Sequence, residues 1–299
     1  MSTAGRPPGG PDLPALTPTV LRGWPLPEPG TGKYGRGAVV VVGGSPGTPG
    51  AVVLSGLAAL RVGAGKLSLA AAASVAAALA VAVPEAGVTP LEEDDGGALT
   101  GGGLDPLEHK LERASAVLVG PGLADPDGTL ALLDGVLART GPDVPFVLDA
   151  FAVGVLPRLS AAADRLRGRV VLTPNADEVA FLLDVDDVAD DDLPDAVRTV
   201  AERYGAAVSC GDVVAADGTL WRKTTGDRGL GTSGSGDVLA GAITGLLARG
   251  AGPGQAAAWG THVLAAAGDR LAGSVGRVGY LARELLDVLP AVLTELGGT

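Results

Sequence analysis

Short runs of apolar residues alternate along this chain with longer segments in which apolar residues recur every three to four positions. The first run, residues 38–42, is an alanine followed by valines, without a polar position. An uninterrupted β-branched run is typical of a parallel strand that helices cover on both faces. A helical pattern follows from residue 50 to about residue 62. We therefore predict that the folded region begins with a strand and a helix.

The same alternation continues along the rest of the chain. We predict further strands at residues 66–70, 116–119, 145–148, 170–172 and 207–209. We predict further helices at residues 73–83, 128–139, 176–183, 192–204, 235–249, 254–272 and 279–295. Residues 213–216 and 220–223 flank an Asp217-Gly218 pair, which is a strong hairpin signal. The pattern predicts an α/β fold with a mainly parallel central sheet, helices on both faces and a small antiparallel edge.

Two segments lack this periodicity. Residues 1–32 are rich in proline and glycine, and we predict a flexible arm, partly packed near residues 21–24, ahead of one domain over residues 33–299. Residues 91–103 are acidic and glycine-rich, and we interpret them as a loop inserted in that domain. The apolar run at 67–83 contains serines and is shorter than the roughly 20 residues that span a bilayer, so we expect no membrane association.

The composition excludes several classes of protein. The chain has 299 residues, of which 34 are acidic and 22 basic, and its formal net charge is −12. This acidic balance argues against nonspecific binding to nucleic acid or to a membrane, because both surfaces are anionic. A single cysteine excludes an internal disulfide and a thiolate-rich zinc site, and we predict no metal-ligating residues. No signal peptide is recognisable, so we expect a cytoplasmic protein.

The glycine-rich loop 226–237 carries the most chemical information, because it runs directly into an apolar helix. Backbone N–H groups and the positive end of the helix dipole would meet there at one anion, and glycines let a phosphate approach closely. The loop therefore fits a phosphate site, and an ordinary helix start with capping fits the same pattern. Asp237 could take a proton from a hydroxyl that attacks phosphorus, although an aspartate also suits an ordinary first helical turn. The loop matches neither the P-loop nor the Rossmann pattern.

Residues 234–237 resemble the Gly-x-Gly-Asp signature of the ribokinase-like fold, and residues 232–241 resemble the ADP/ATP-dependent NAD(P)H-hydrate dehydratases. Further segments resemble that family in the same order along the chain: 42–45, 49–51, 59–65, 120–123, 147–150, 172–178 and 279–282. The resemblance covers about residues 34–295. An ordered set of this kind is more specific than any single motif.

The resemblance implies an enzyme that repairs nicotinamide nucleotides. It would dehydrate the S epimer of hydrated NADH or NADPH (NADHX or NADPHX) by phosphorylating the ring hydroxyl and eliminating phosphate. ADP or ATP would be the phosphate donor, and Mg²⁺ would come with the nucleotide. The family also implies a homo-oligomer, with a tetramer favoured. Family members often carry an epimerase domain, and with 32 residues before the fold we expect a separate epimerase instead.

The resemblance also assigns residues to roles. Asp237 would be the catalytic base. The residues expected to bind the hydrated substrate are Ala51, Gly122, Asn175 and Asp237. The residues expected to bind the nucleotide are Cys210, Gly211, Gly234, Ser235 and Gly236.

Three positions depart from the family pattern. Asn175 stands where the family usually has a histidine, and an asparagine is also a good helix N-cap. Phe151 stands where the family usually has a second aspartate. Cys210 stands where the family usually has a lysine that contacts the nucleotide. Nearby basic residues that could replace that charge are Arg222, Lys223 and Arg228.

Two other functions fit parts of the sequence. A kinase of the same fold that acts on a small alcohol, such as a thiamine precursor, would use the Gly-x-Gly-Asp loop equally well. A non-catalytic nucleotide-binding protein would account for the three departures. The segments at 42–65 and 279–282 favour the dehydratase over the kinase, whereas nucleotide binding without turnover would favour the non-catalytic protein.

Overall fold

The computed structural model describes residues 13–159 and 161–298, and its strands form a single mixed sheet. The strands are β1 (Ala15–Leu16), β2 (Ala38–Val42), β3 (Lys66–Ala72), β4 (Ala86–Leu91), β5 (Ala116–Val119), β6 (Phe146–Leu148), β7 (Val170–Leu172), β8 (Ala207–Cys210), β9 (Val213–Ala216) and β10 (Thr219–Lys223). Their order across the sheet is β1-β10-β9-β8-β7-β6-β5-β2-β3-β4. Neighbours from β4 to β8 pair parallel, whereas β9 pairs antiparallel with both β8 and β10. The predicted fold class is confirmed.

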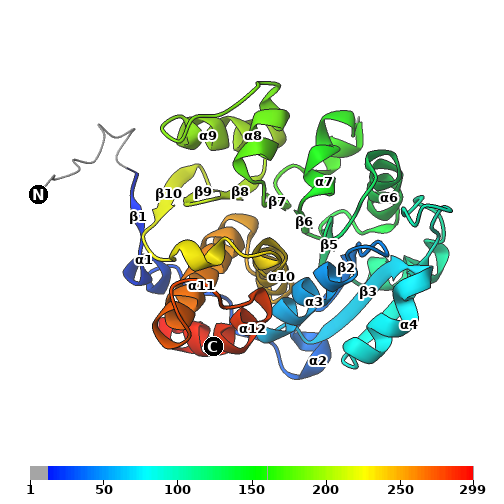
Figure 1. Cartoon of the computed structure of the whole chain (residues 1–299), viewed down its shortest axis with the longest axis horizontal. Coiled ribbons are helices and arrows are strands. Elements are labelled where there is room, and N and C mark those ends of the chain that lie inside the picture. Colours follow the sequence, from blue (N-terminus) through cyan, green and yellow to red (C-terminus); the bar gives the residue numbers. More distant parts are fainter. Residues whose placement is uncertain (1–12, 160, 299) are drawn as a thin grey trace, which may run out of the picture.

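Helices cover both faces of the sheet, as Figure 1 shows. The helices are α1 (Pro18–Arg22), α2 (Gly32–Gly35), α3 (Gly50–Arg61), α4 (Ala73–Ala82), α5 (Glu108–Glu112), α6 (Pro126–Arg139), α7 (Phe151–Gly154), α8 (Ala176–Leu183), α9 (Leu193–Tyr204), α10 (Ser235–Ala248), α11 (Pro253–Ser274) and α12 (Ala282–Leu296). Helices α3, α10, α11 and α12 lie on one side of the strands and α6 to α9 lie on the other (Figure 1). Each side has its own hydrophobic core.

Strand β2 shows why the valine run needs no polar position. Val39 and Val41 belong to the core under α3 and α10, whereas Val40 and Val42 belong to the core on the opposite face. Successive side chains of a strand point to opposite faces, so a strand covered on both sides is apolar throughout. The prediction for residues 38–42 is confirmed, with β2 between β3 and β5.

Residues 13–32 belong to the segment that we predicted as a flexible arm partly packed near residues 21–24, and two buried leucines hold them to the domain. Leu16 in β1 pairs parallel with Lys223 of β10, and Leu16 and Leu21 are fully buried. The Thr17 hydroxyl caps α1 by accepting the N–H of Val20. The contact of Leu21 agrees with the packing predicted near residues 21–24, whereas Leu16 in a proline-rich segment belongs to no periodic pattern, so the sequence did not indicate β1. Residues 1–12 lie outside the described residues.

Strand β4 is absent from the sequence prediction. It contains Gly87 and Pro90, and both residues weaken the pattern of a strand. Its place at the edge of the sheet explains the proline, because an edge strand has one side without a pairing partner. The acidic loop begins where β4 ends, and Glu93 and Leu99 form an isolated bridge within it.

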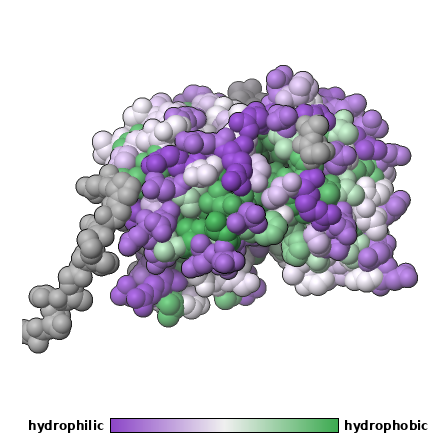
Figure 2. All heavy atoms as spheres, turned by 90° about the horizontal axis from the view of Figure 1, so that it is seen from above, coloured by the Kyte–Doolittle hydropathy of each residue, from purple (hydrophilic) through white to green (hydrophobic). Residues whose placement is uncertain are grey.

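Hydrophilic residues cover most of the face drawn in Figure 2, with apolar residues gathered near its centre. Within the described ranges, no helix has both the length and the apolar character needed to cross a bilayer. The apolar run at 67–83 is divided between β3 and α4, as predicted.

Candidate active site

The polar and glycine-rich segments gather at one edge of the sheet. Strands β2, β5, β6, β7 and β8 run parallel, so their carboxyl ends meet at this edge. The segments that follow them are 43–51, 120–123, 149–150, 173–178 and 211–212, and Cys210 is the last residue of β8. Open α/β sheets bind ligands at the carboxyl ends of their strands. This edge is therefore the candidate site, and most of the predicted residues lie along it.

Ala51 and Gly122 are brought together by a pair of loops. The N–H of Ser45 and the hydroxyl of Thr48 both donate to the Gly122 carbonyl oxygen, at 2.8 and 3.0 Å. Gly122 has φ of +67°, and an added Cβ there would overlap the Thr48 carbonyl oxygen and lie 3.1 Å from the Ala51 Cβ. Only glycine fits this close approach without strain.

The N-terminus of α10 joins the same edge. Gly234 has φ of +90°, and an added Cβ would lie 2.6 Å from the Cδ1 of Leu54, one helical turn after Ala51 in α3. The Ser235 hydroxyl donates to the Leu230 carbonyl oxygen at 2.7 Å and so fixes the glycine loop on the helix. Across the described residues, no backbone acceptor is found for the N–H groups of Gly236 and Asp237. Free N–H groups at a helix N-terminus favour an anion.

Asp237 is a carboxylate with no competing partner. The described part of the chain provides neither a hydrogen bond nor an ion pair to its side chain. Burial raises the pKa of Asp237 to about 6. A carboxylate with a pKa close to neutrality is better suited to accept a proton than an exposed aspartate, whose pKa is about 4.

Asp149 is a site residue that the sequence analysis did not assign. It follows β6, is 7% exposed, and accepts a hydrogen bond from the Thr173 hydroxyl at 2.8 Å. Burial raises the pKa of Asp149 to about 7; the Thr173 hydrogen bond opposes this rise, and the charges of Asp237 and Glu178 add to it. The carboxyl groups of Asp237 and Glu178 thus both act on Asp149 at this edge. An acidic residue directly after a buried strand was the available signal.

A family model matches residues 39–291 of the chain, and its description is NAD(P)H-hydrate dehydratase. The chain belongs to this family. It is 43% identical over 292 residues to the ADP-dependent (S)-NAD(P)H-hydrate dehydratase of Xanthomonas campestris, covering 96% of this chain and 98% of that protein. Other relatives are bifunctional NAD(P)H-hydrate repair enzymes, and the chain spans about half the length of these.

Solved structures agree with this NAD(P)H-hydrate dehydratase assignment. The ADP/ATP-dependent NAD(P)H-hydrate dehydratase of Bacillus subtilis, co-crystallised with ATP/Mg²⁺, has a TM-score of 0.73 and 25% identity, with 95% of this chain and 99% of that one covered. A ribokinase-like protein of Enterococcus faecalis has a TM-score of 0.80 at 23% identity, covering 95% and 96% of the two chains. The second similarity shows the ribokinase-like fold.

Two of the positions that depart from the dehydratase family lie in well-defined surroundings. The Asn175 side chain accepts the N–H of Glu178 at 2.8 Å, and the Glu178 carboxylate accepts the N–H of Asn175 at 2.9 Å. This is a capping box at the start of α8, as the helix N-cap interpretation predicts. The exposed Asn175 amide group still has its N–H donors for a ligand. Phe151 is 40% exposed at the start of α7.

The Cys210 side chain does not replace the lysine of the family pattern. It is 1% exposed, and burial raises the pKa of the thiol to about 12, so it is neutral near pH 7. Gly211 follows in the left-handed region with φ of +58°. Of the basic residues nearby, Arg222 forms an ion pair with Asp212 at 3.1 Å, and Lys223 is half-buried at the end of β10. Nucleotide binding at residues 210–211 stays a prediction for their backbone groups.

Ala150 holds a strained conformation beside Asp149. Its φ of 48° and ψ of −125° fall where residues with a Cβ are rarely found. We expect Ala150→Gly to increase the free energy of unfolding by about 1 kcal/mol, since relief of strain exceeds the entropy that glycine adds to the unfolded chain. Urea unfolding would measure this. Ala152→Gly, at a fully buried helical position of α7, is the control and should lower stability. A destabilised Ala150→Gly variant would contradict the prediction.

Proposed function

We propose that this chain converts the S epimer of NADHX or NADPHX into NADH or NADPH, with ADP or ATP as phosphate donor. The observation that carries the proposal is the N-terminus of α10, where an unpartnered Asp237 lies beside free backbone N–H groups. This is the arrangement that a hydroxyl-to-phosphate transfer requires: a base for the hydroxyl proton and donors for the phosphoryl oxygens. Membership of the dehydratase family agrees with it.

The first step would be phosphorylation of the ring hydroxyl. The hydroxyl oxygen attacks the terminal phosphorus of the nucleotide, its proton passes to the Asp237 carboxylate, and the bond from phosphorus to the bridging oxygen breaks. The N–H groups of Gly236 and Asp237 would stabilise the charge on the transferring phosphoryl group. Gly236 has open space around its Cα, so nothing on the protein side blocks a phosphate there.

The second step would be elimination. The new phosphate ester leaves with the electrons of the carbon–oxygen bond, and a proton leaves the neighbouring ring carbon, which restores the double bond. We propose that Ala51 and Gly122 line the pocket for the ring, because their loops bring small residues to this edge. Asn175 would donate from its free amide N–H groups. Asp149, with a pKa of about 7, would still hold its proton where Asp237 ionises, so Asp237 is the carboxylate that is free to act as the base.

Mg²⁺ is part of the proposal as a companion of the nucleotide. In the described residues, no group of three or more His, Cys, Asp or Glu side chains is placed to hold a metal. We propose that phosphate oxygens and water hold the ion, as Mg²⁺ prefers. The bound ion would offset the negative charge of the phosphates.

The decisive experiment is an assay with purified protein, Mg²⁺ and the S epimer of NADHX, in which ADP and ATP are tested separately. Regeneration of NADH absorbance with release of phosphate supports the proposal and identifies the donor. A stable phosphorylated product would indicate a kinase instead. Nucleotide binding by calorimetry without turnover would indicate a non-catalytic protein.

The pH dependence of the reaction follows from Asp237. Because the base must be ionised, we expect kcat/KM to fall as the pH decreases through about 6. In Asp149→Asn this limb should stay near pH 6, because Asp149 has a pKa of about 7 and is already protonated where Asp237 ionises. Initial rates between pH 5 and 8 would measure the limb in both proteins. A limb that moves to lower pH in Asp149→Asn would show that Asp149 is charged while Asp237 titrates, and would contradict this order of ionisation.

We also propose that the protein acts in the cytoplasm as a homo-oligomer, with a tetramer favoured, and that a separate epimerase supplies the S epimer. The Xanthomonas campestris relative, of which the chain covers 98%, is named for the dehydratase activity alone. Light scattering on the purified protein would test the oligomeric state. A monomer at micromolar concentration would contradict it.

A further inference from the structure

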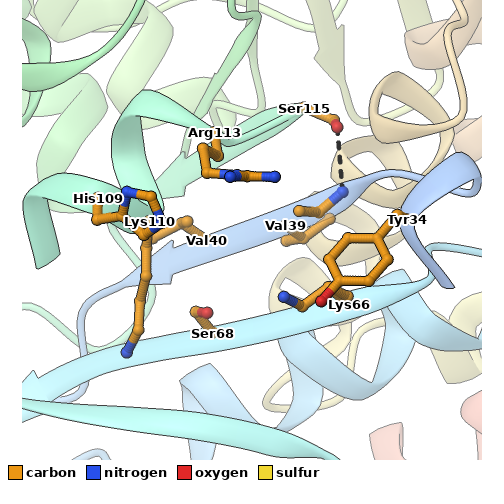
Figure 3. A pocket seen from close by; sticks show the side chains of 10 residues that line it. Tyr34, Val39, Val40, Lys66, Ser68, His109, Lys110, Arg113 and Ser115 are labelled. Carbon is orange, nitrogen blue, oxygen red and sulfur yellow. Dashed lines mark hydrogen bonds between the residues drawn. The ribbon is translucent and has the colours of Figure 1, made fainter.

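Most of the lysines of this acidic protein lie around one pocket far from the candidate active site. The chain has four lysines in all. Lys66 and Lys110 line a pocket of 340 Å³ together with Tyr34, His109 and Arg113. Lys33 lies over the ring of Tyr34, 5.4 Å from its centroid. We call this the basic pocket (Figure 3).

The basic pocket lies at the amino ends of the central strands. Ala38 and Lys66 are the first residues of β2 and β3, and Ser115 directly precedes β5. Its other wall is formed by His109 and Lys110 of α5 and by Arg113 directly after that helix (Figure 3). The five residues of β2 separate it from the carboxyl edge, a distance of about 13 Å at the usual rise per residue.

The lysines and the arginine of the basic pocket have no acidic partner among the described residues, whereas His109 has Glu112 at 3.7 Å. No aspartate or glutamate lines it. In the described ranges, no carboxylate lies within 4.0 Å of a charged nitrogen of Lys66, Lys110 or Arg113. Burial lowers the pKa of Lys110, and the charge of Lys66 lowers it further. The chain as a whole has a net charge of −12, so cations placed together without counter-ions are unusual here.

Hydroxyl groups lie between these cations. Lys110 donates to the Thr89 hydroxyl at 2.5 Å, and Thr89 pairs with Ala70 of β3. Lys66, Ser68 and Ala70 share one face of β3, because alternate residues of a strand point the same way. The Ser68 hydroxyl therefore lies between the two ammonium groups, as Figure 3 shows. Cations at several points along a row of hydroxyls fit an extended anion better than a single small ion.

We propose that the basic pocket binds the phosphate chain of a small polyphosphate, either inorganic or part of a nucleotide. Lys66 and Lys110 would contact different phosphates of the chain, with Arg113 at one end and Ser68 in the middle. A volume of 340 Å³ is large enough for a tri- or tetraphosphate chain. This site is independent of the proposed dehydratase reaction, because it lies at the opposite end of the strands.

The small number of lysines allows a direct test on the intact protein. Acylation of each lysine by an amine-reactive reagent would be followed by mass spectrometry, without ligand and with tripolyphosphate, ATP or sulfate. We expect tripolyphosphate to slow the labelling of Lys66 and Lys110 at concentrations at which sulfate has no effect. Protection by ATP as well would indicate that a nucleotide can supply the chain, and protection by tripolyphosphate alone would indicate an inorganic anion. The labelling rate of Lys223, which lies at the carboxyl edge, would report any binding at the candidate active site.

Variants separate the basic pocket from other anion sites. Lys66 and Arg113 are exposed, so Lys66→Gln and Arg113→Gln should leave the fold intact. Each should weaken the protection of Lys110 by tripolyphosphate about tenfold in concentration. Lys223→Gln, the same change at the other edge, should leave that protection unchanged. Equal protection in all variants, or no protection in the wild-type protein, would overturn the proposal. Slow labelling of Lys66 and Lys110 in the absence of ligand, becoming fast when the protein is diluted, would also overturn it. The pocket would then be an interface between copies of this chain.

Discussion

Asp237→Asn should lower kcat of the dehydration by about 10³-fold or more, while the nucleotide still binds. The amide of asparagine has nearly the size of the carboxylate but cannot take the hydroxyl proton. The N–H groups at the start of α10 do not depend on the side chain, so the phosphate site should persist. Loss of a negative charge beside the phosphates should, if anything, tighten nucleotide binding.

The measurement is single-turnover phosphate release, with calorimetry of nucleotide binding on the same preparation. Asp195→Asn is the matched control, because Asp195 carries the same charge in an exposed ion pair with Arg198. It should keep wild-type kcat. If Asp237→Asn kept more than about a tenth of the wild-type kcat, another group would have to be the base.

The central part of the fold could be predicted because each of its signals is local. The valines of β2 and the turn at Asp217-Gly218 each indicate one structure within a few residues. The strands at the two edges of the sheet could not be predicted in this way. β4 contains a proline, and β1 is two residues long, so each is held by its neighbour rather than by its own pattern.

The candidate site was predictable where backbone geometry requires glycine. Gly122 and Gly234 have positive φ and lie against neighbouring segments, where a side chain would be strained or would clash. The glycines in the sequence therefore indicate this backbone geometry. Asp149 differs, because its significance comes from burial and from the charges of Asp237 and Glu178, which belong to separate elements. The inert surroundings of Cys210 also arise from tertiary packing. The folded structure decides which ionisable side chains lie close enough to shift the pKa of another. No periodic pattern in the sequence indicates this.

Gly120→Ala should both destabilise the protein and disturb Asp149. Gly120 follows β5 with φ of +133°, a conformation that an alanine rarely adopts. An added Cβ would overlap the carbonyl oxygen of Asp149, which is backbone and cannot move aside as a flexible side chain would. Gly120 also donates its N–H to Val42 of β2 at 3.1 Å, so any shift would be transmitted to three strand ends at once.

Strain and overpacking together should lower the free energy of unfolding by about 3 kcal/mol for Gly120→Ala. For a domain of this size that corresponds to a decrease in Tm of roughly 6 °C or more. Gly87→Ala in β4 is the control, because Gly87 has no atom within 4 Å of an added Cβ, has no positive φ and lies in an edge strand outside the candidate site. Calorimetry of both variants measures the difference. Because the Asp149 backbone must move, kcat/KM should also fall in Gly120→Ala and keep its wild-type value in Gly87→Ala. Wild-type stability together with an unchanged kcat/KM would show that the ends of β5 and β6 can separate freely, and that Asp149 is not held in position by Gly120.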